Sequence, residues 1–333
     1  MSIRIIIPAL LVLLIALLPL HASWLQVVFT LALAKGLAVL GIIVLLHAGQ
    51  VSFGHALFFA VAAYMAAFLG HNFAGGELAL MMLLGVTASL FVGLLVGLFV
   101  VRYRYIFFGM LNLAFSMIFY SILEKFYFVT GGADGLQVAR PSVLGIQLER
   151  DGFETLLFYG SLVLCMLVAW GVHRFLNSPI GHMMKAIKTN ETRLEYLGIS
   201  ARRTLLVGYV LSAGLAGLGG VLMAVAQGIV TPEYAWWIRS GELVFIAILG
   251  GADSVAGAFV GALLYEVVRS YAAAFAADFW QMILGFFLLG IILYASRGLV
   301  GVYDAVIARL EGKRRTDTAP ADEKAAKAME AAE

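Results

Sequence analysis

Charged and hydrogen-bonding side chains interrupt the apolar stretches of this sequence at a few positions, and they are the first candidates for chemistry. Lys35 lies eleven residues after Trp24 in an apolar run, and His47 and His55 flank the polar stretch 48–54. A cation or an imidazole among apolar residues can bind a small anion or zwitterion, or it can hold neighbouring segments together through a buried pair. The sequence therefore offers binding chemistry at these positions.

Several interpretations of these polar residues remain open. His47 and His55 do not predict a metal site, because no Cys, Asp or Glu lies at ligand spacing from them. We expect them to donate hydrogen bonds to bent backbone, with contact to a small solute as the alternative. Asn112 faces either another helix or a cavity. Lys35 either binds a solute or pairs with an acid that fixes helix packing. The acids available for that pair are Glu242, Asp253 and Glu266.

The composition places these residues in a membrane. The chain has 333 residues, of which 62% are hydrophobic and 13% charged, whereas soluble domains are nearer half apolar and a quarter charged. Crossing a bilayer core of about 30 Å takes roughly 20 helical residues. The apolar blocks therefore predict an all-α polytopic membrane protein, with Lys35 near mid-bilayer. The blocks are 5–20, 24–46, 56–70, 78–101, 105–122, 153–176, 205–227, 241–269 and 279–296.

Lysine and arginine in short connections predict which helix ends face the cytoplasm. Six Lys and Arg residues lie in 174–203, two lie in 102–104, and a basic tail begins at 297, so these segments should be cytoplasmic. Segment 124–154 carries five acids against three basic residues and should lie outside. With block 5–20 as a first membrane helix, rather than a cleaved signal, both termini are expected to be cytoplasmic.

The same orientation rule makes two segments fold back. Segment 241–269 must begin and end outside, with its plausible turn at 250–257, and segment 24–70 must do the same, turning at 47–55. We therefore predict about ten membrane segments, some short or re-entrant, and an internal pseudo-repeat with a Gly-rich broken element in each half. Such paired interruptions point to a transporter's binding site. The alternative is that both breaks are ordinary short cytoplasmic turns.

The stretch 178–200 is the one sizeable polar segment on the predicted cytoplasmic side before the tail. Apolar residues recur in it at nearly helical spacing and Gly198 marks a turn, so it predicts a short amphipathic helix. Such a helix can lie flat on anionic lipid or present apolar side chains to a partner's groove. The chain has no phosphate-binding loop motif, so any ATP must bind to another subunit, and no motif supports an enzyme.

Several stretches, taken in order along the chain, carry a resemblance to a known family. They resemble the permease subunits of bacterial branched-chain amino acid ABC importers, of the LivM-like type, over nearly the whole membrane part. The expected domains are then a transmembrane permease domain 1–300 with a cytoplasmic coupling loop 177–204, and a cytoplasmic tail 301–333 with a disordered end. The stretches are GQVSFGHALFFAVAAY (49–64), RYRYIFFGMLNLAF (102–115), TGGADGL (130–136), GHMMKAIKTNETRLEYLGIS (181–200), LSAGLAGLGGVLMA (211–224) and ILGGADSVAGAFVGALL (248–264), followed by RGLVG (297–301).

The resemblance implies partners. It implies a heteromer in the bacterial inner membrane, with a second related permease, two cytoplasmic ATP-binding subunits and a periplasmic substrate-binding protein. This chain is then no enzyme and binds no cofactor or metal, while ATP and magnesium belong to the partners. The loop 177–204 resembles the helix that docks into the ATPase, although His182 replaces a common Arg. The coupling residues so implied are Gly181, Met184, Ala186, Ile187, Lys188, Glu191 and Gly198.

The resemblance also implies a substrate, either a branched-chain amino acid or a related small carboxylate or amide. This chain departs from the family at Tyr105, where Gly is frequent, and at Asn112, where Thr is frequent. The alternative function is an ion-coupled secondary transporter or channel, with Lys35 and Asp253 as the coupling pair. A structural scaffold is poorly supported, because a scaffold needs no breaks in its membrane helices. The expected substrate pathway comprises Lys35, Ser52, Gly54, His55, Asn112, Gly251 and Ser254.

Overall fold

The structure is a computed structural model that describes residues 17, 24–72, 76–275, 279–294, 298–303, 305 and 307. The predicted first membrane helix at 5–20 and the predicted disordered end at 312–333 lie outside the described residues, apart from residue 17. Statements about the fold and its contacts refer to the described part of the chain.

The described chain is α-helical apart from a two-residue strand pair, short 3-10 turns and connections. Each apolar block predicted within it coincides with a helix, except that 241–269 divides into two. Six helices are long and apolar enough to cross a membrane. The helices are α2 (Trp24–His47), α3 (His55–Asn72), α4 (Leu78–Val100), α5 (Tyr105–Lys125), α6 (Tyr127–Thr130), α7 (Arg150–Leu176), α8 (Pro179–Tyr196), α9 (Ala201–Gln227), α10 (Trp237–Gly250), α11 (Val255–Phe275) and α12 (Trp280–Tyr294).

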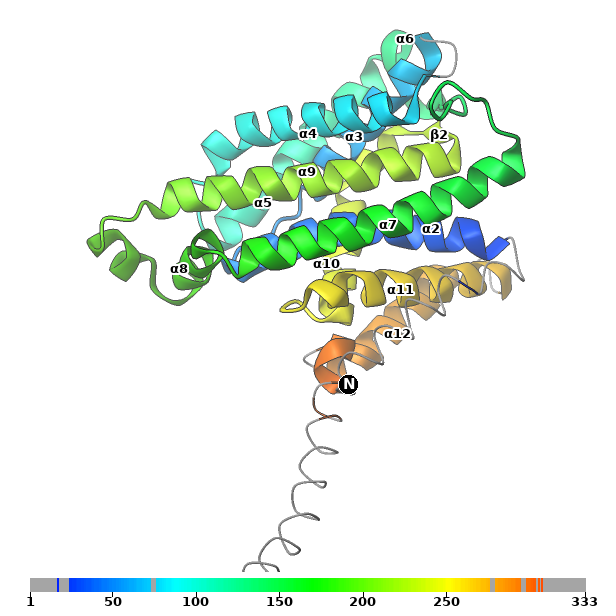
Figure 1. The fold of residues 1–333 in the computed structure, drawn as a ribbon. Helices are drawn as coiled ribbons and strands as arrows, with labels where there is room; N and C mark the ends of the chain where they lie inside the picture. The colour runs from blue at the N-terminus through cyan, green and yellow to red at the C-terminus, as the bar shows by residue number, and fades with distance from the viewer. Residues whose placement is uncertain are drawn as a thin grey trace, which may run out of the picture.

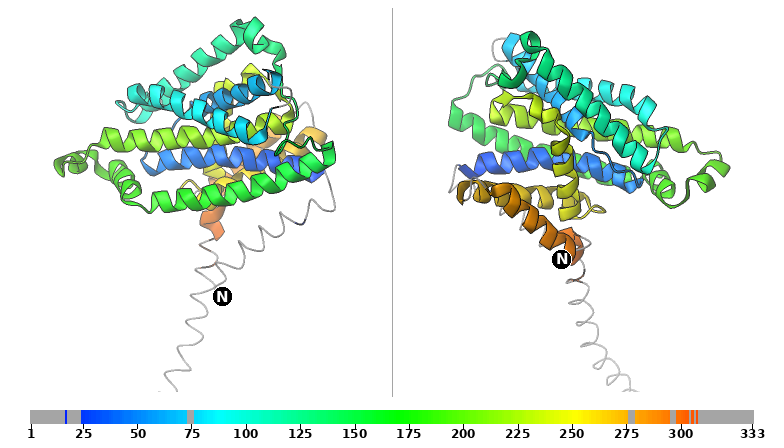
Figure 2. Two further views of the ribbon diagram at one scale, coloured as in Figure 1. Left: turned by 45° about the horizontal axis from the view of Figure 1, so that its top comes forward. Right: turned by 180° about the vertical axis from the view of Figure 1, so that it is seen from behind.

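Helices α2 and α9 form the centre of the bundle, and the left-hand view of Figure 2 shows them side by side. The apolar window of α2 is 83% buried and that of α9 is 72% buried, whereas α4 and α5 are each 28% buried. Glycines let α9 approach its neighbours closely: a β-carbon at Gly219 would lie 2.3 Å from the Ala34 carbonyl oxygen, and one at Gly220 would lie 2.1 Å from that of Phe59. The outer helices present exposed Leu, Ile and Phe, as expected for surfaces that face lipid.

The bundle has two distinct ends (Figure 1). One end, which we call the α8 end, holds α8 and the turn at 102–104. The Arg104 guanidinium joins the two by donating hydrogen bonds of 2.7 and 2.8 Å to the Glu191 carboxylate. The other end, the strand end, holds β1 (Leu136–Gln137) paired antiparallel with β2 (Ile229–Val230). The segments predicted to share the cytoplasmic side therefore share one end, and segment 124–154 contributes β1 to the other.

Helix α10 is oriented differently from the long helices. It crosses them at a steep angle, as the right-hand view of Figure 2 shows. Before it, the 3-10 turn η3 (Pro232–Ala235) leads the chain from β2 into the bundle, where the Ser116 hydroxyl donates a hydrogen bond to the Ala235 carbonyl oxygen. Because α10 cuts across the bundle, its side chains can meet those of α2, α3 and α11 in one place.

Candidate functional site

The first predicted break, 48–54, is a non-helical segment whose residues are buried or half-buried. It runs along α5: the Gln50 side chain accepts a hydrogen bond from the Tyr105 amide at 2.9 Å, and Gly54 packs so tightly that a β-carbon there would lie 2.4 Å from the Asn112 carbonyl oxygen. Seven residues of α5 rise about 10 Å, so the segment enters the bundle by about that depth from the α8 end. Ser52 is fully buried. This geometry favours non-helical backbone inside the bundle over a short exposed turn.

His55 and Asn112 both face helix α9. The His55 Nε2 atom lies 2.5 Å from the Ser212 hydroxyl. The Asn112 side chain accepts a hydrogen bond from the Tyr209 hydroxyl and donates one to the Phe108 carbonyl oxygen. The expectation that His55 would bond to bent backbone is wrong for Nε2. The reason is that α3 begins at His55, so its ring leaves the break and packs against α9. Asn112 faces another helix rather than a cavity.

Tyr105, where the resemblance implies that Gly is frequent, has a φ of 53° at the start of α5. This left-handed backbone conformation costs a non-glycine residue about 1–2 kcal/mol. The side chain is 73% exposed, so little burial offsets that cost. The departure from the family pattern thus falls at a position whose backbone favours glycine.

The second break, between α10 and α11, is a tight turn at the α8 end. Gly251 has a φ of 118° and lies against Gly298, where a β-carbon on Gly298 would be 2.5 Å from the Gly251 α-carbon. Asp253 has a side chain that is 93% exposed and lies 3.9 Å from the Lys188 ammonium. Ser254 follows in the same turn. The two breaks therefore differ: the first is a longer non-helical segment of buried and half-buried residues, and the second is a short, partly exposed turn.

Lys35 forms a buried ionic pair with two acids. Its ammonium lies 2.5 Å from the Glu242 carboxylate and 2.7 Å from the Glu266 carboxylate, and its side chain is only 3% exposed. It also lies 4.9 Å from the centre of the Tyr265 ring. Of the two alternatives left open for Lys35, the acid pair is present, with Glu242 and Glu266 as partners, while Asp253 lies by Lys188.

Two arginines extend this pair into a chain of alternating charges, which we call the ionic chain. Arg239 lies 3.3 Å from Glu242 and Arg269 lies 3.1 Å from Glu266, measured between Nη1 and the carboxylate oxygen. The ionic chain thus runs from α10 through α2 to α11. With all five groups ionised it holds three positive and two negative charges, an excess of one positive charge. Its members are Arg239, Glu242, Lys35, Glu266 and Arg269.

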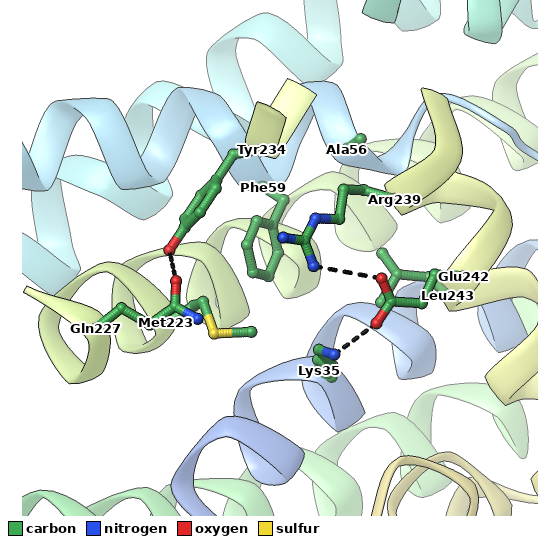
Figure 3. Close-up of a pocket in the computed structure, with 9 residues that line it drawn as sticks. All are labelled: Lys35, Ala56, Phe59, Met223, Gln227, Tyr234, Arg239, Glu242 and Leu243. Atoms are coloured by element: carbon green, nitrogen blue, oxygen red, sulfur yellow. Dashed lines mark hydrogen bonds and ion pairs between the residues drawn. The ribbon is translucent and has the colours of Figure 1, made fainter. Parts of the chain in front are cut away.

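A small pocket adjoins the ionic chain (Figure 3). The cavity volume of about 20 Å³ holds about one water molecule. The Tyr234 hydroxyl donates a hydrogen bond to the Gln227 side chain at one end, and Arg239, Glu242 and Lys35 lie at the other. The lining residues are Lys35, Ala56, Phe59, Met223, Gln227, Tyr234, Arg239, Glu242 and Leu243.

The structure thus separates the predicted pathway residues into three places. Lys35 lines the pocket; Ser52, Gly54, His55 and Asn112 lie along α5 and α9; Gly251 and Ser254 lie at the α8 end. The sequence analysis missed Arg239, Gln227 and Tyr234 as site residues. One feature of the sequence could have indicated Arg239. Two acid–base pairs lie three residues apart within apolar helices, Arg239 with Glu242 and Glu266 with Arg269.

Helix α8 directs its apolar side toward its own bundle. Met184 and Ile187 are buried, and the Met184 side chain lies 2.4 Å from where a Gly208 β-carbon would be on α9. The expectation that this side lies on lipid or fills a partner's groove is therefore wrong, because α9 already covers it. The predicted coupling residues divide accordingly. Gly181, Met184 and Ile187 are buried, Ala186 and Glu191 are half-buried, and Lys188 and Gly198 are exposed.

Together, the apolar helices, their central glycine contacts and the buried ionic chain define a multi-pass membrane protein. The chain belongs to the family described as "Branched-chain amino acid transport system / permease component", whose match spans residues 25–293. This family consists of transport permeases rather than enzymes, and the match confirms the resemblance seen in the sequence. No solved structure matches the chain.

Similar proteins include three transport permeases. The chain is 28% identical over 273 residues to the high-affinity branched-chain amino acid transport system permease protein LivM of Escherichia coli (strain K12), covering 76% of this chain and 64% of that protein. LivM of Salmonella typhimurium is 27% identical with the same coverage. BraD of Pseudomonas aeruginosa is 26% identical over 141 residues, 42% of this chain and 46% of that protein. The matched region thus spans just under two thirds of the length of LivM.

Proposed function

We propose that this chain is the permease subunit of an ABC importer that moves branched-chain amino acids, or a related small carboxylate or amide, across the bacterial inner membrane. The observation that carries this proposal is the family match over residues 25–293. The relatives LivM, LivH and BraD bear names of branched-chain amino acid transport permeases. This chain supplies the membrane passage and hydrolyses no ATP.

The proposed architecture has about ten membrane segments, both termini in the cytoplasm and two broken elements that reach into the membrane. The domain division is a permease domain 1–300 and a cytoplasmic tail 301–333. The non-helical backbone at 48–54, with Ala48, Gln50 and Ser52 buried, supports it, since such backbone persists at membrane depth only where protein or water satisfies its polar groups. The proposed substrate pathway passes Lys35, Ser52, Gly54, His55, Asn112, Gly251 and Ser254.

The proposed partners are a second related permease, two cytoplasmic ATP-binding subunits that carry ATP and magnesium, and a periplasmic substrate-binding protein. Helix α8 is the proposed coupling element. Its Lys188 lies 3.9 Å from Asp253 in the second break and against Gly49 in the first, and its Glu191 holds Arg104. A displacement of α8 by an ATPase would therefore act on both breaks at once.

Reconstitution tests this function. We expect leucine uptake into proteoliposomes only when this chain is combined with its partner permease, both ATPases and the binding protein, and only with ATP. Gradient-driven uptake by this chain alone would instead support an ion-coupled transporter. The pair proposed for that alternative is not in contact, because Lys35 binds Glu242 and Glu266 whereas Asp253 lies by Lys188.

The docking role of α8 predicts the effect of charge reversal on its exposed side. Lys185 and Thr189 are exposed on α8, so the double variant Lys185→Glu, Thr189→Glu should weaken ATPase association at least about tenfold, about 1.4 kcal/mol. Co-purification with the ATPases at graded concentrations measures this. Ile187 is unsuitable as a probe because its side chain is buried.

The matched control is Lys125→Glu, an exposed position at the end of α5. It should leave ATPase association unchanged. If the α8 double variant also binds the ATPases as the unaltered chain does, the exposed side of α8 is not the docking surface.

A further inference from the structure

The pocket beside the ionic chain has two unlike walls. Figure 3 shows Phe59 and Met223 between the polar ends, and Leu243 completes an apolar wall. The polar wall is formed by Gln227, Tyr234, Arg239, Glu242 and Lys35. A small molecule with a charged head and an aliphatic side chain matches these two walls, because each part meets groups of its own kind.

Arg239 is the cation with unused binding capacity in this pocket. A guanidinium has five N–H donors in a fixed fork, yet the contact described for Arg239 is one ion pair, 3.3 Å from Nη1 to the Glu242 carboxylate. By contrast, Lys35 has carboxylates at 2.5 and 2.7 Å. The Arg239 side chain is 31% exposed and lines the cavity.

Two further features favour an anionic group beside Arg239. The ionic chain carries an excess of one positive charge, which favours an anionic group next to one of its cations. Arg239 also lies in the first turn of α10, a helix of 14 residues, where the helix dipole adds partial positive charge. The fork of an arginine binds a carboxylate through two parallel hydrogen bonds, which fixes its orientation.

We propose that Arg239 binds the carboxylate of the transported molecule, an α-amino acid with an aliphatic side chain, in this pocket. The aliphatic side chain of the bound amino acid lies against Phe59, Met223 and Leu243, and its ammonium group faces Glu242. This inference rests on the proposed transport function and names its substrate class and its binding residue. The permease itself then selects for a carboxylate, in addition to any selection by a binding protein.

The structure shows this pocket closed. Its cavity of about 20 Å³ holds about one water molecule, so an amino acid enters only after the walls separate. The hydrogen bond between Tyr234 and Gln227 spans the end nearer β2, and Gln227 is exposed there, at the end of α9. Opening this bond connects the pocket to the strand end of the bundle.

Binding to the purified complex of permeases and ATPases, without the binding protein, tests the assignment. L-leucine and L-leucinamide, which lacks the carboxylate, are compared as probes. We expect Arg239→Gln to weaken leucine binding by about tenfold or more and to leave leucinamide binding within threefold. Arg239→Lys keeps the positive charge, so it should recover part of the preference for leucine over leucinamide. Arg150→Gln, an exposed arginine paired with Glu154, is the matched control and should bind both probes normally.

A cysteine-protection experiment keeps the test valid if Arg239→Gln does not fold. Cys165 is the single cysteine of the sequence, so Cys165→Ala with Gln227→Cys places one thiol at the exposed end of the pocket. Leucine should slow its modification by a charged methanethiosulfonate reagent, and leucinamide at the same concentration should slow it less. Three outcomes overturn the inference while leucine uptake by the intact system persists. They are equal protection by both probes, no protection by leucine, and an unchanged preference of Arg239→Gln for leucine over leucinamide. Absence of that uptake overturns the transport proposal as well.

Discussion

Replacing Lys35 with methionine is expected to destabilise the protein by about 3–5 kcal/mol. The reason is electrostatic: Glu242 and Glu266 would both lose their shared cation, and the Glu266 side chain is only 3% exposed. Each carboxylate would keep one arginine, Arg239 for Glu242 and Arg269 for Glu266, but would lose the shorter of its two ion pairs at a buried position. That loss costs more than the packing that a methionine restores. The free energy of unfolding, measured in detergent by denaturant titration, reports the change.

Two variants make this prediction specific to the buried pair. Lys125→Met removes a lysine from an exposed position and should change stability by less than about 0.5 kcal/mol. Adding Glu266→Gln to Lys35→Met removes one of the two carboxylates that lost the ammonium and should return part of the lost stability. If Lys35→Met unfolds at the same denaturant concentration as the unaltered protein, the ionic chain does not stabilise the fold in the way that its geometry indicates.

Replacing Gly220 with alanine is expected to cost about 3 kcal/mol. The added methyl group would lie 2.1 Å from the Phe59 carbonyl oxygen, which is backbone and cannot rotate away. Helices α3 and α9 would have to move apart, and α9 is at the centre of the bundle. The same denaturant titration measures the loss, and weaker assembly with partner subunits should accompany it.

Gly171→Ala is the matched control, because no atom lies within 4 Å of the position of its β-carbon on α7. Alanine has the higher helix propensity, so this variant should be neutral or more stable by up to about 1 kcal/mol. Equal stabilities of the two variants would show that the close approach of α9 to α3 is not a requirement of the native fold.

The helices were predictable because each apolar block in the described chain is long enough to require a helix in lipid. The division of 241–269 was predictable for another reason: the distribution of Lys and Arg placed its two ends on one side. The detailed form of the breaks was not predictable. That 48–54 would lie along α5, whereas 251–254 would be a tight turn, depends on contacts between distant segments.

The candidate site was predictable only in part. Lys35 stands out because a charge in an apolar run needs a partner, and both of its partners were among the acids considered. Arg239 and Tyr234 did not stand out, since both lie in the connection between the apolar blocks 205–227 and 241–269, where polar residues are ordinary. Their convergence on Lys35 follows from the steep crossing of α10. Likewise, the spacing in α8 predicted that one side would be covered but not that α9 would cover it.

The ionic chain has a mechanical consequence for α10. Glu242 fixes this helix to α2 three residues from Arg239 and nine residues from Gly251, so α10 is held near one of its ends. At 1.5 Å per residue the two arms measure about 4.5 and 13.5 Å. Helix α10 can therefore act as a lever that pivots at Glu242. The long arm ends near the contact between Lys188 and Asp253. A force applied there would move the Arg239 end of the helix through about a third of the displacement of the long arm, with about three times the applied force.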